Sequence, residues 1–314
     1  LGLDLNLNYL FGIFILTQAL LSFYLFVKLH KDIGFIIVLA KRSAISLDMK
    51  KGLPLVMVFI SDLILAASDR FVIGYYMSSE HVGLYNVAYM LGVVIMIIPK
   101  GIMGILPQFF SKLIDANKVE SANKLLSYSM NIFFIIFVPF VVIMSLFSSD
   151  AIADIVQKSA IGQASLVSII ISISSPFFAF YIFSSGYLFA LRKTSEIFYI
   201  SLAIAIFNLI SNIILLSYYP LLFIPAATTL ISYIFGSLLC VGYAGINVKL
   251  INKKIFIKVI ISSSIMLLVS WFISVDYWLV EAFILFSIYI LLMLSFNIYQ
   301  NLLDFWDHCY NDRN

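Results

Sequence analysis

The chain has 314 residues, of which 63% are hydrophobic and 11% charged, and its formal net charge is +3. Soluble globular proteins are about 45–50% apolar and about 25% charged, so this chain cannot cover itself with polar groups in water. The composition excludes a soluble enzyme or a soluble nucleic-acid-binding protein and predicts an all-α polytopic membrane protein.

Nine segments are apolar over the length that a membrane-spanning helix requires, about 20 residues. In chain order they are approximately residues 8–29, 53–76, 83–110, 125–147, 163–190, 197–218, 221–245, 256–274 and 277–299. The third segment contains Pro99, Gly101, Gly104 and Pro107, which predict a bend or a loosened stretch in that helix. No connection is long enough for a sizeable soluble domain.

Basic residues are distributed asymmetrically among the connections. With residues 1–7 placed outside, the inner loops and the C-terminal tail contain 16 of the 19 Lys and Arg residues, whereas the outer loops contain only Lys158. Basic residues in short loops favour the cytoplasmic side of a membrane. We therefore expect the N-terminus outside and the C-terminus in the cytoplasm. The connector at residues 32–51 is either an amphipathic segment along the cytoplasmic interface or an irregular basic loop.

Three charged residues lie inside the second segment. A charge at mid-bilayer costs roughly 2.5–3.5 kcal/mol on insertion scales, so it usually faces a partner or a hydrated cavity. Asp69 and Arg70 are adjacent and point about 100° apart on a helix, whereas Asp69 shares a face with Asp62. Arg70 either lines an aqueous pathway and attracts an anion, or forms an interhelical ion pair that fixes packing.

Lys100, Asn208 and Asn212 are also polar residues within apolar segments. Lys100 follows Pro99 late in the third segment, and its side chain either extends to the cytoplasmic interface or faces a cavity. Asn208 and Asn212 are four residues apart and share one helical face. Such amides usually form hydrogen bonds between helices, and substrate contact is the alternative.

Motifs for catalysis and metal binding were not found in the sequence. It contains no nucleotide-binding loop, nucleophile elbow or HExxH pattern. The cysteines, Cys240 and Cys309, form no CxxC pair, and the three histidines are far apart. Neither a disulfide framework nor a zinc site is expected, and we expect the protein not to be an enzyme.

Several stretches resemble Wzx-type polysaccharide flippases, members of the superfamily that also contains MATE drug exporters and the lipid II flippase. The longest is GLPLVMVFISDLILAASDRFVIGYYMSSEHVGLYNVAYML, with its Gly-Leu-Pro opening, Ser-Asp-Arg pattern and following Val-Gly-x-Tyr-x-x-Ala-Tyr. ILPQFFSKL and FNLISNIILLSYYPLLFIPAATTLISY agree with later family motifs. The last departs from the family at Pro220 and Pro225, where the family turn is usually glycine-rich. Together the matches cover residues 52 to about 248.

The resemblance implies a MATE-like fold with two six-helix lobes and a final hairpin, of which this chain would begin at the sixth helix. The first residue is Leu1, and no basic signal region precedes the first segment, so we expect the natural start to be missing. Residues 1–31 would then be the last helix of the N-terminal lobe and 32–51 the connector. Residues 52–248 would form the C-terminal lobe, 249–300 a two-helix hairpin and 301–314 a cytoplasmic tail.

The resemblance also implies a function. The protein would move an undecaprenyl-diphosphate-linked oligosaccharide, such as an O-antigen, capsule or exopolysaccharide repeat unit, across a bacterial or archaeal cytoplasmic membrane by alternating access. Its partners would be the polyprenyl-diphosphate-linked glycan, membrane lipids, and a polysaccharide polymerase with glycosyltransferases, but no nucleic acid. No cofactor is implied, and coupling to H⁺ or Na⁺ stays open. The candidate cavity residues are Arg70, Asp69, Lys100, Asp62, Asn208 and Asn212.

Three other functions stay open. A MATE-type exporter of small cations would favour acidic cavity residues, and Asp62 and Asp69 fit it, although Arg70 and Lys100 accompany them. A membrane-embedded enzyme of polysaccharide synthesis would be of a different class, and polymerases of this kind typically have a large external loop. A non-transporting assembly subunit is the third alternative.

Overall fold

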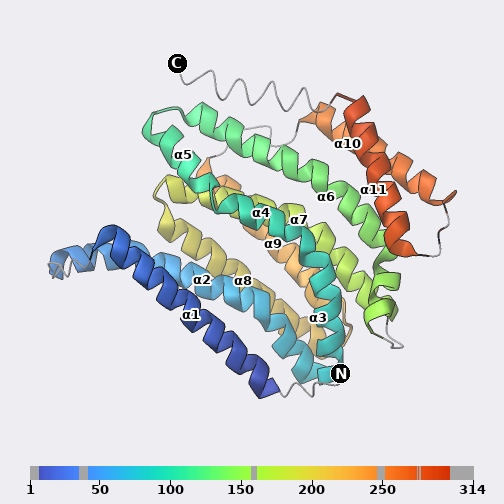
Figure 1. The fold of residues 1–314 in the computed structure, drawn as a ribbon, viewed down its shortest axis with the longest axis horizontal. Helices are drawn as coiled ribbons and strands as arrows, with labels where there is room; N and C mark the ends of the chain where they lie inside the picture. The colour runs from blue at the N-terminus through green and yellow to red at the C-terminus, as the bar shows by residue number, and fades with distance from the viewer. Residues whose placement is uncertain are drawn as a thin grey trace. The chain divides into compact units, whose positions relative to one another are not determined.

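The computed structural model describes residues 7–34, 42–156, 161–245, 252–273, 275 and 277–297. Within these ranges every regular element is helical (Figure 1). The chain divides into two compact units, Leu1–Lys50 and Lys51–Asn314. The first contains α1 and the beginning of α2, and the second contains everything that follows. Residues 301–314, the expected cytoplasmic tail, lie outside the described residues.

The helices follow one another with short connections. They are α1 (Leu7–Ile33), α2 (Arg42–Tyr76), α3 (Ser79–Val93), η1 (Val94–Met96), α4 (Ile97–Met103), α5 (Leu106–Asp115), α6 (Val119–Ile155), α7 (Ile161–Ala190), α8 (Thr194–Tyr218), α9 (Ile224–Ala244), α10 (Lys253–Ser270) and α11 (Trp278–Ser295). Each of the nine apolar segments predicted from the sequence coincides with one helix or, for the third, with the run from α3 to α5. The all-α prediction is confirmed.

Seven of these helical stretches are long and apolar enough to cross a membrane: α1, the run from α3 to α5, and α6, α7, α8, α9 and α11. The protein is therefore a multi-pass membrane protein. Helices α2 and α10 are not among the seven. The 18 residues of α10 include three lysines, and α2 carries Asp62, Asp69 and Arg70. A charge inside a membrane helix usually faces a partner or a hydrated cavity, so we expect the insertion of α2 to depend on its neighbours.

Helix α7 is the central element of the second unit. It packs against α3, α6 and α9, and α6, α7 and α9 run side by side (Figure 1). Its sequence is rich in serine, and Ser168 donates a hydrogen bond to the carbonyl of Ala88 on α3 at 2.8 Å. Small residues allow close backbone approach between helices in a membrane, where apolar side chains gain little by leaving lipid. The serines therefore make α7 a helix that neighbours can surround closely.

The break expected in the third segment is present. Helix α3 gives way to the 3₁₀ turn η1, then to the seven-residue α4, and a turn at Gly104 separates α4 from α5. Pro107 has no backbone N–H and cannot complete the helical ladder across this turn. As a result, Lys100 lies on a short helical segment with an irregularity on each side.

The hairpin of α10 and α11 packs on α6. Pro139 lies inside α6 and has no backbone N–H. The carbonyl of Ile135, four residues earlier, therefore has no amide donor within the helix. The hydroxyl of Tyr289 on α11 donates to that carbonyl at 2.7 Å. At the far end of the hairpin, Trp278 Nε1 donates to Asp154 at 2.6 Å. The hairpin thus satisfies a backbone group that the proline leaves without a partner.

Gly92 marks the closest approach of α3 to α7. A Cβ atom at this position would lie 2.7 Å from Ile171 Cβ and 2.8 Å from the Ser168 carbonyl oxygen. We expect Gly92→Ala to lower the free energy of unfolding by about 1–3 kcal/mol, because overpacking forces the two helices apart. Thermal unfolding of the detergent-purified protein measures the effect.

Gly83 provides the matched control on the same helix. A Cβ atom there meets nothing within 4 Å, and alanine favours a helix interior over glycine by roughly 0.5–1 kcal/mol. Gly83→Ala should therefore leave the unfolding temperature unchanged or raise it. Equal effects of the two substitutions would contradict the close contact at Gly92.

Candidate functional site

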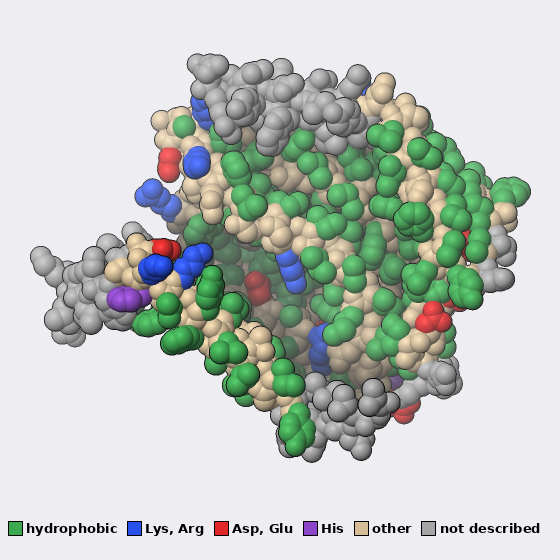
Figure 2. All heavy atoms as spheres, in the orientation of Figure 1, with side chains coloured by type: hydrophobic (Ala, Val, Ile, Leu, Met, Phe, Trp, Pro, Cys, Tyr) green, Lys and Arg blue, Asp and Glu red, His purple; other side chains and the backbone are tan. Residues whose placement is uncertain are grey.

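A cavity of about 520 Å³ opens in the second unit between α2, α3, α4, α7 and α9. Most of its wall is apolar or aromatic, and the charged residues that line it are Asp62, Arg70 and Lys100. Figure 2 shows basic and acidic side chains in the hollowed centre of this face, surrounded by hydrophobic ones. The cavity therefore brings one acid and two cations together on an otherwise apolar surface.

Arg70 is held in place by its neighbours on α2 and α3. Its Nε donates to Asn86 Oδ1, and its Nη1 donates to the carbonyl of Ala66. The guanidinium carbon lies 4.7 Å from the centroid of the Tyr89 ring, a distance at which the cation and the ring attract each other. A guanidinium has five N–H donors, and these contacts use two. Arg70 is thus oriented and retains donors for an anion in the cavity.

Asp62 and Lys100 lie on opposing elements of the wall, α2 and α4. The hydroxyl of Tyr181 on α7 donates to Asp62 Oδ1 at 3.2 Å. Lys100 Nζ lies 5.5 Å from the centroid of the Phe178 ring, and its charge interacts with that of Asp62. Asp62 and Lys100 are both exposed at the cavity, so each charge can also interact with a bound molecule.

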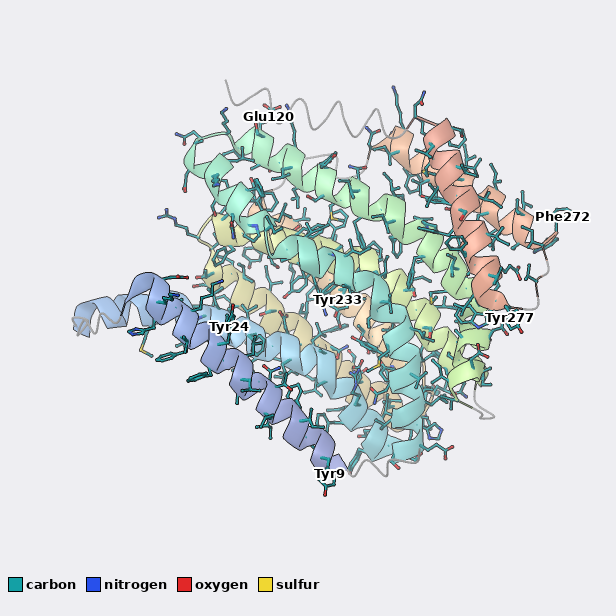
Figure 3. The ribbon with its side chains drawn as sticks, viewed as in Figure 1. Tyr9, Tyr24, Glu120, Tyr233, Phe272 and Tyr277 are labelled. Atoms are coloured by element: carbon teal, nitrogen blue, oxygen red, sulfur yellow. The ribbon has the colours of Figure 1, made fainter. Side chains whose placement is uncertain are left out.

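Three aromatic side chains complete the cavity wall beside Asp62, namely Phe178, Tyr181 and Tyr233. The ring of Tyr233 packs edge-on against Phe178, with centroids 5.1 Å apart, and stacks with Tyr181 at 6.5 Å. Tyr233 is 5% exposed, and Figure 3 shows it in the interior of the helical assembly. The edge-on geometry is the one that aromatic quadrupoles favour. The rings therefore form a rigid surface beside Asp62.

Asp69 lies outside the cavity wall, in a buried hydrogen-bonded cluster that joins α2, α3, α8 and α9. Its carboxylate, 1% exposed, accepts hydrogen bonds from Tyr85 at 2.7 Å, from Asn212 at 2.7 Å and from Thr229 at 3.3 Å. A buried carboxylate is costly unless hydrogen bonds satisfy it. The three donors supply that compensation, and the charge of the adjacent Arg70 adds to it.

Asn208 and Asn212, both fully buried, extend the same cluster. Asn212 Nδ2 donates to Asn208 Oδ1 at 3.2 Å, and Asn208 Nδ2 donates to Thr229 at 3.2 Å. Thr228 donates to Asn212 Oδ1, and Ser68 donates to Asn208 Oδ1 at 3.3 Å. The groups that face the Asp69 carboxylate are thus hydroxyl and amide N–H donors, and the two amide oxygens of the cluster accept hydrogen bonds from other members. A proton or a hard cation neutralises such a carboxylate, and the cation does so only by displacing these donors from its oxygens.

The segment that contains most of this site also matches a known protein family. The sequence profile of the MatE family matches residues 54–214, which is half of the chain. The chain belongs to the MatE family. Residues 54–214 include all three charged cavity residues and, except for Thr228 and Thr229, the cluster around Asp69.

The MatE-family chain also resembles a solved structure, lipid II flippase MurJ in its inward closed conformation. The TM-score is 0.65 at 20% sequence identity, and the match covers 88% of this chain and 59% of the MurJ chain. The two proteins share a fold, and the chain spans 59% of the length of the flippase that it matches. No curated protein has a sequence that matches this one.

In this MatE-family protein, the structure separates the six candidate residues into two groups. Asp62, Arg70 and Lys100 line the cavity, whereas Asp69, Asn208 and Asn212 lie in the buried cluster. Sequence reasoning missed the partners, namely Tyr85, Asn86, Tyr89, Tyr181, Thr228, Thr229 and Tyr233. Tyr85 and Tyr89 are the two tyrosines of the Val-Gly-x-Tyr-x-x-Ala-Tyr pattern, and the two threonines lie in the AATT motif, so a signal for these four was present in the stretches that carry the resemblance. Asn86, Tyr181 and Tyr233 had no signal that distinguished them from other polar and aromatic residues.

Proposed function

We propose that this protein transports a lipid-linked oligosaccharide whose anchor is a polyprenyl diphosphate, moving it from the cytoplasmic to the outer leaflet by alternating access. The observation that carries the proposal is the position of Arg70, oriented by Asn86 and Tyr89 on the wall of an apolar cavity among membrane-length helices. The MatE family membership and the MurJ-like fold support a transporter of this kind.

The physical argument concerns the diphosphate. It carries about two negative charges, and ions are expensive to transfer into hydrocarbon. A guanidinium binds phosphate oxygens through two parallel N–H bonds, and these charge-assisted bonds are about twice as strong as neutral ones. Arg70 therefore lowers the cost of moving the anionic group along a cavity whose apolar walls accommodate the start of the lipid chain.

Asp69 and its cluster are the proposed site for the coupling ion. The cluster offers one carboxylate, so a single positive charge, either H⁺ or Na⁺, neutralises it, whereas a divalent ion does not. The site touches α2, α3, α8 and α9 at once. An ion that stabilises one arrangement of these helices shifts the equilibrium between arrangements by its difference in affinity. Arg70 follows Asp69 directly, so such a shift would move the cavity cation.

The proposed location is a cytoplasmic membrane, with the α7–α8 turn in the cytoplasm and the α6–α7 connection outside. The basic residues Arg192 and Lys193 in the α7–α8 turn support this orientation. After replacement of Cys240 and Cys309, single cysteines at Ser195 and at Ser149, both exposed, should react with an impermeant thiol reagent from opposite sides. Reaction of both from one side would refute the orientation.

The decisive experiment is transport in liposomes. The protein, expressed from its own gene and reconstituted, should move a fluorescent polyprenyl-diphosphate sugar between leaflets, as measured by a reagent that quenches only the outer leaflet. Protein-free liposomes and liposomes with an unrelated helical membrane protein give the background. A rate no higher than this background would reject the proposal.

A MatE-type export of small cations is the second candidate, favoured by the exposed carboxylate of Asp62 in the cavity. The two functions predict opposite effects of charge removal. An exporter of cations should lose activity with Asp62→Asn and tolerate Arg70→Gln, whereas a diphosphate flippase should lose activity with Arg70→Gln. Uptake of a fluorescent cation into everted vesicles, measured beside lipid transport, distinguishes them.

A further inference from the structure

The cavity has two polar ends with different chemistry. Arg70 and Asp62 are eight residues apart on α2, which corresponds to about 12 Å along the helix axis at 1.5 Å per residue. The end at Arg70 offers donors fixed by Asn86 and Tyr89. The end at Asp62 offers a carboxylate acceptor with Tyr181 beside it. A ligand that fills the cavity therefore meets a cation at one end and an acceptor at the other.

We infer that the Asp62 end is a subsite for the first sugar ring, and that Asp62 is a residue that determines specificity for a hydroxyl-bearing head group. The inference rests on the proposed function and concerns the part of the substrate that carries no phosphate. Arg70 binds the diphosphate, and Asp62 accepts hydrogen bonds from the ring hydroxyls. A diphosphate joined to one hexose has a length comparable to the separation of the two residues.

The surroundings of Asp62 differ from those of a structural carboxylate. Asp69, seven residues after Asp62 on the same helix, is buried and receives three hydrogen bonds. Asp62 is exposed at the cavity, and the described residues supply it with one hydrogen bond, from Tyr181 to Oδ1. A carboxylate has about four acceptor sites, so Asp62 has unused capacity. A pair of sugar hydroxyls can use that capacity.

The aromatic rings next to Asp62 supply the apolar half of a sugar site. Phe178, Tyr181 and Tyr233 pack together as one surface that lines the cavity. Each of the three rings is 8% exposed or less, so together they offer the cavity a narrow apolar wall on which the C–H groups of a sugar ring can pack. Binding sites in general combine such apolar walls with a few placed polar groups.

Lys100 prevents Asp62 from repelling the diphosphate. Its ammonium lies over the Phe178 ring and interacts with the Asp62 charge. Arg70 likewise has a carboxylate nearby, that of Asp69, but Asp69 is buried outside the cavity, whereas Asp62 is exposed in it. The charges that a ligand in the cavity meets are therefore positive at the Arg70 end and balanced at the Asp62 end. This asymmetry sets the direction of the ligand in the cavity, with phosphate toward Arg70 and the ring toward Asp62.

The test compares two ligands on the purified full chain in nanodiscs, by surface plasmon resonance. One is a short-chain polyprenyl diphosphate, and the other is the same lipid with a single neutral hexose on the diphosphate. Wild type should bind the sugar-bearing lipid about tenfold more tightly, since a hydrogen bond to a charged group contributes about that factor. Asp62→Asn and Asp62→Ala should each remove most of this ratio. Loss of the negative charge should strengthen binding of the diphosphate in both lipids alike, and the ratio cancels that shared effect.

Two controls separate the outcomes. Arg70→Gln should weaken both ligands equally and keep the ratio, and Asp154→Asn, at the exposed carboxylate beside Trp278, should change neither. An unchanged ratio in both Asp62 variants overturns the inference, as does a wild-type protein that binds the two lipids equally. If wild type binds neither lipid, the proposed function itself fails.

Discussion

Replacement of Arg70 with alanine should reduce lipid transport by about 100-fold, because removal of one partner of a desolvated, hydrogen-bonded charge pair typically costs 2–5 kcal/mol. Transport of the labelled polyprenyl-diphosphate sugar in liposomes measures the effect. Arg70→Lys should retain partial activity, roughly tenfold below wild type, because lysine keeps the charge but loses the two-pronged donor geometry and the stacking on Tyr89.

The matched control is another arginine. Arg192 is exposed and lies 3.9 Å from Asp115, and an exposed ion pair of this kind contributes little. Arg192→Ala should transport like wild type at equal protein content. If Arg70→Ala also transports like wild type, Arg70 has no role in the cavity. If instead its unfolding temperature falls sharply and transport per folded molecule is normal, the side chain serves packing.

Replacement of Asp69 with leucine should destabilise the protein by roughly 3 kcal/mol, because each buried donor left without an acceptor costs about 1–3 kcal/mol. Tyr85 loses its acceptor entirely, and Asn212 and Thr229 each lose one hydrogen bond. Asp69→Asn should have a smaller effect, since the amide keeps one acceptor oxygen. Thermal unfolding in detergent should show a decrease of about 5 °C or more for Asp69→Leu.

Asp150 provides the control for Asp69, because its carboxylate is exposed at the end of α6. Asp150→Asn should leave the unfolding temperature within experimental error of wild type. The same variants test the coupling-ion proposal. At constant ionic strength, sodium should raise the unfolding temperature of wild type and not of Asp69→Asn. A rise that is equal in both proteins places the ion elsewhere, and no rise in wild type leaves the proton as the coupling ion.

The helices of this protein could be predicted from the sequence. In hydrocarbon every backbone polar group needs an internal partner, so a long apolar run has few alternatives to a helix. Each of the nine apolar segments coincides with helical structure, including the broken run from α3 to α5 around Pro99 and Gly104. The sequence also predicted that the charged residues of α2 face a partner or a hydrated cavity, because an isolated charge within a membrane segment is costly.

The sequence by itself determined which residues are out of place in a membrane, and it placed Asp69 and Arg70 on different faces of one helix. Only the tertiary structure decided what those faces meet. Arg70 turns to the cavity beside Tyr89, whereas Asp69 turns to Tyr85, Asn212 and Thr229, which come from three other helices. Helical periodicity gives the direction of a side chain relative to its own helix, but the identity of the neighbour depends on how the helices pack. That packing is set by close contacts between small residues, such as Gly92 against α7, and the hydropathy of a segment does not encode it.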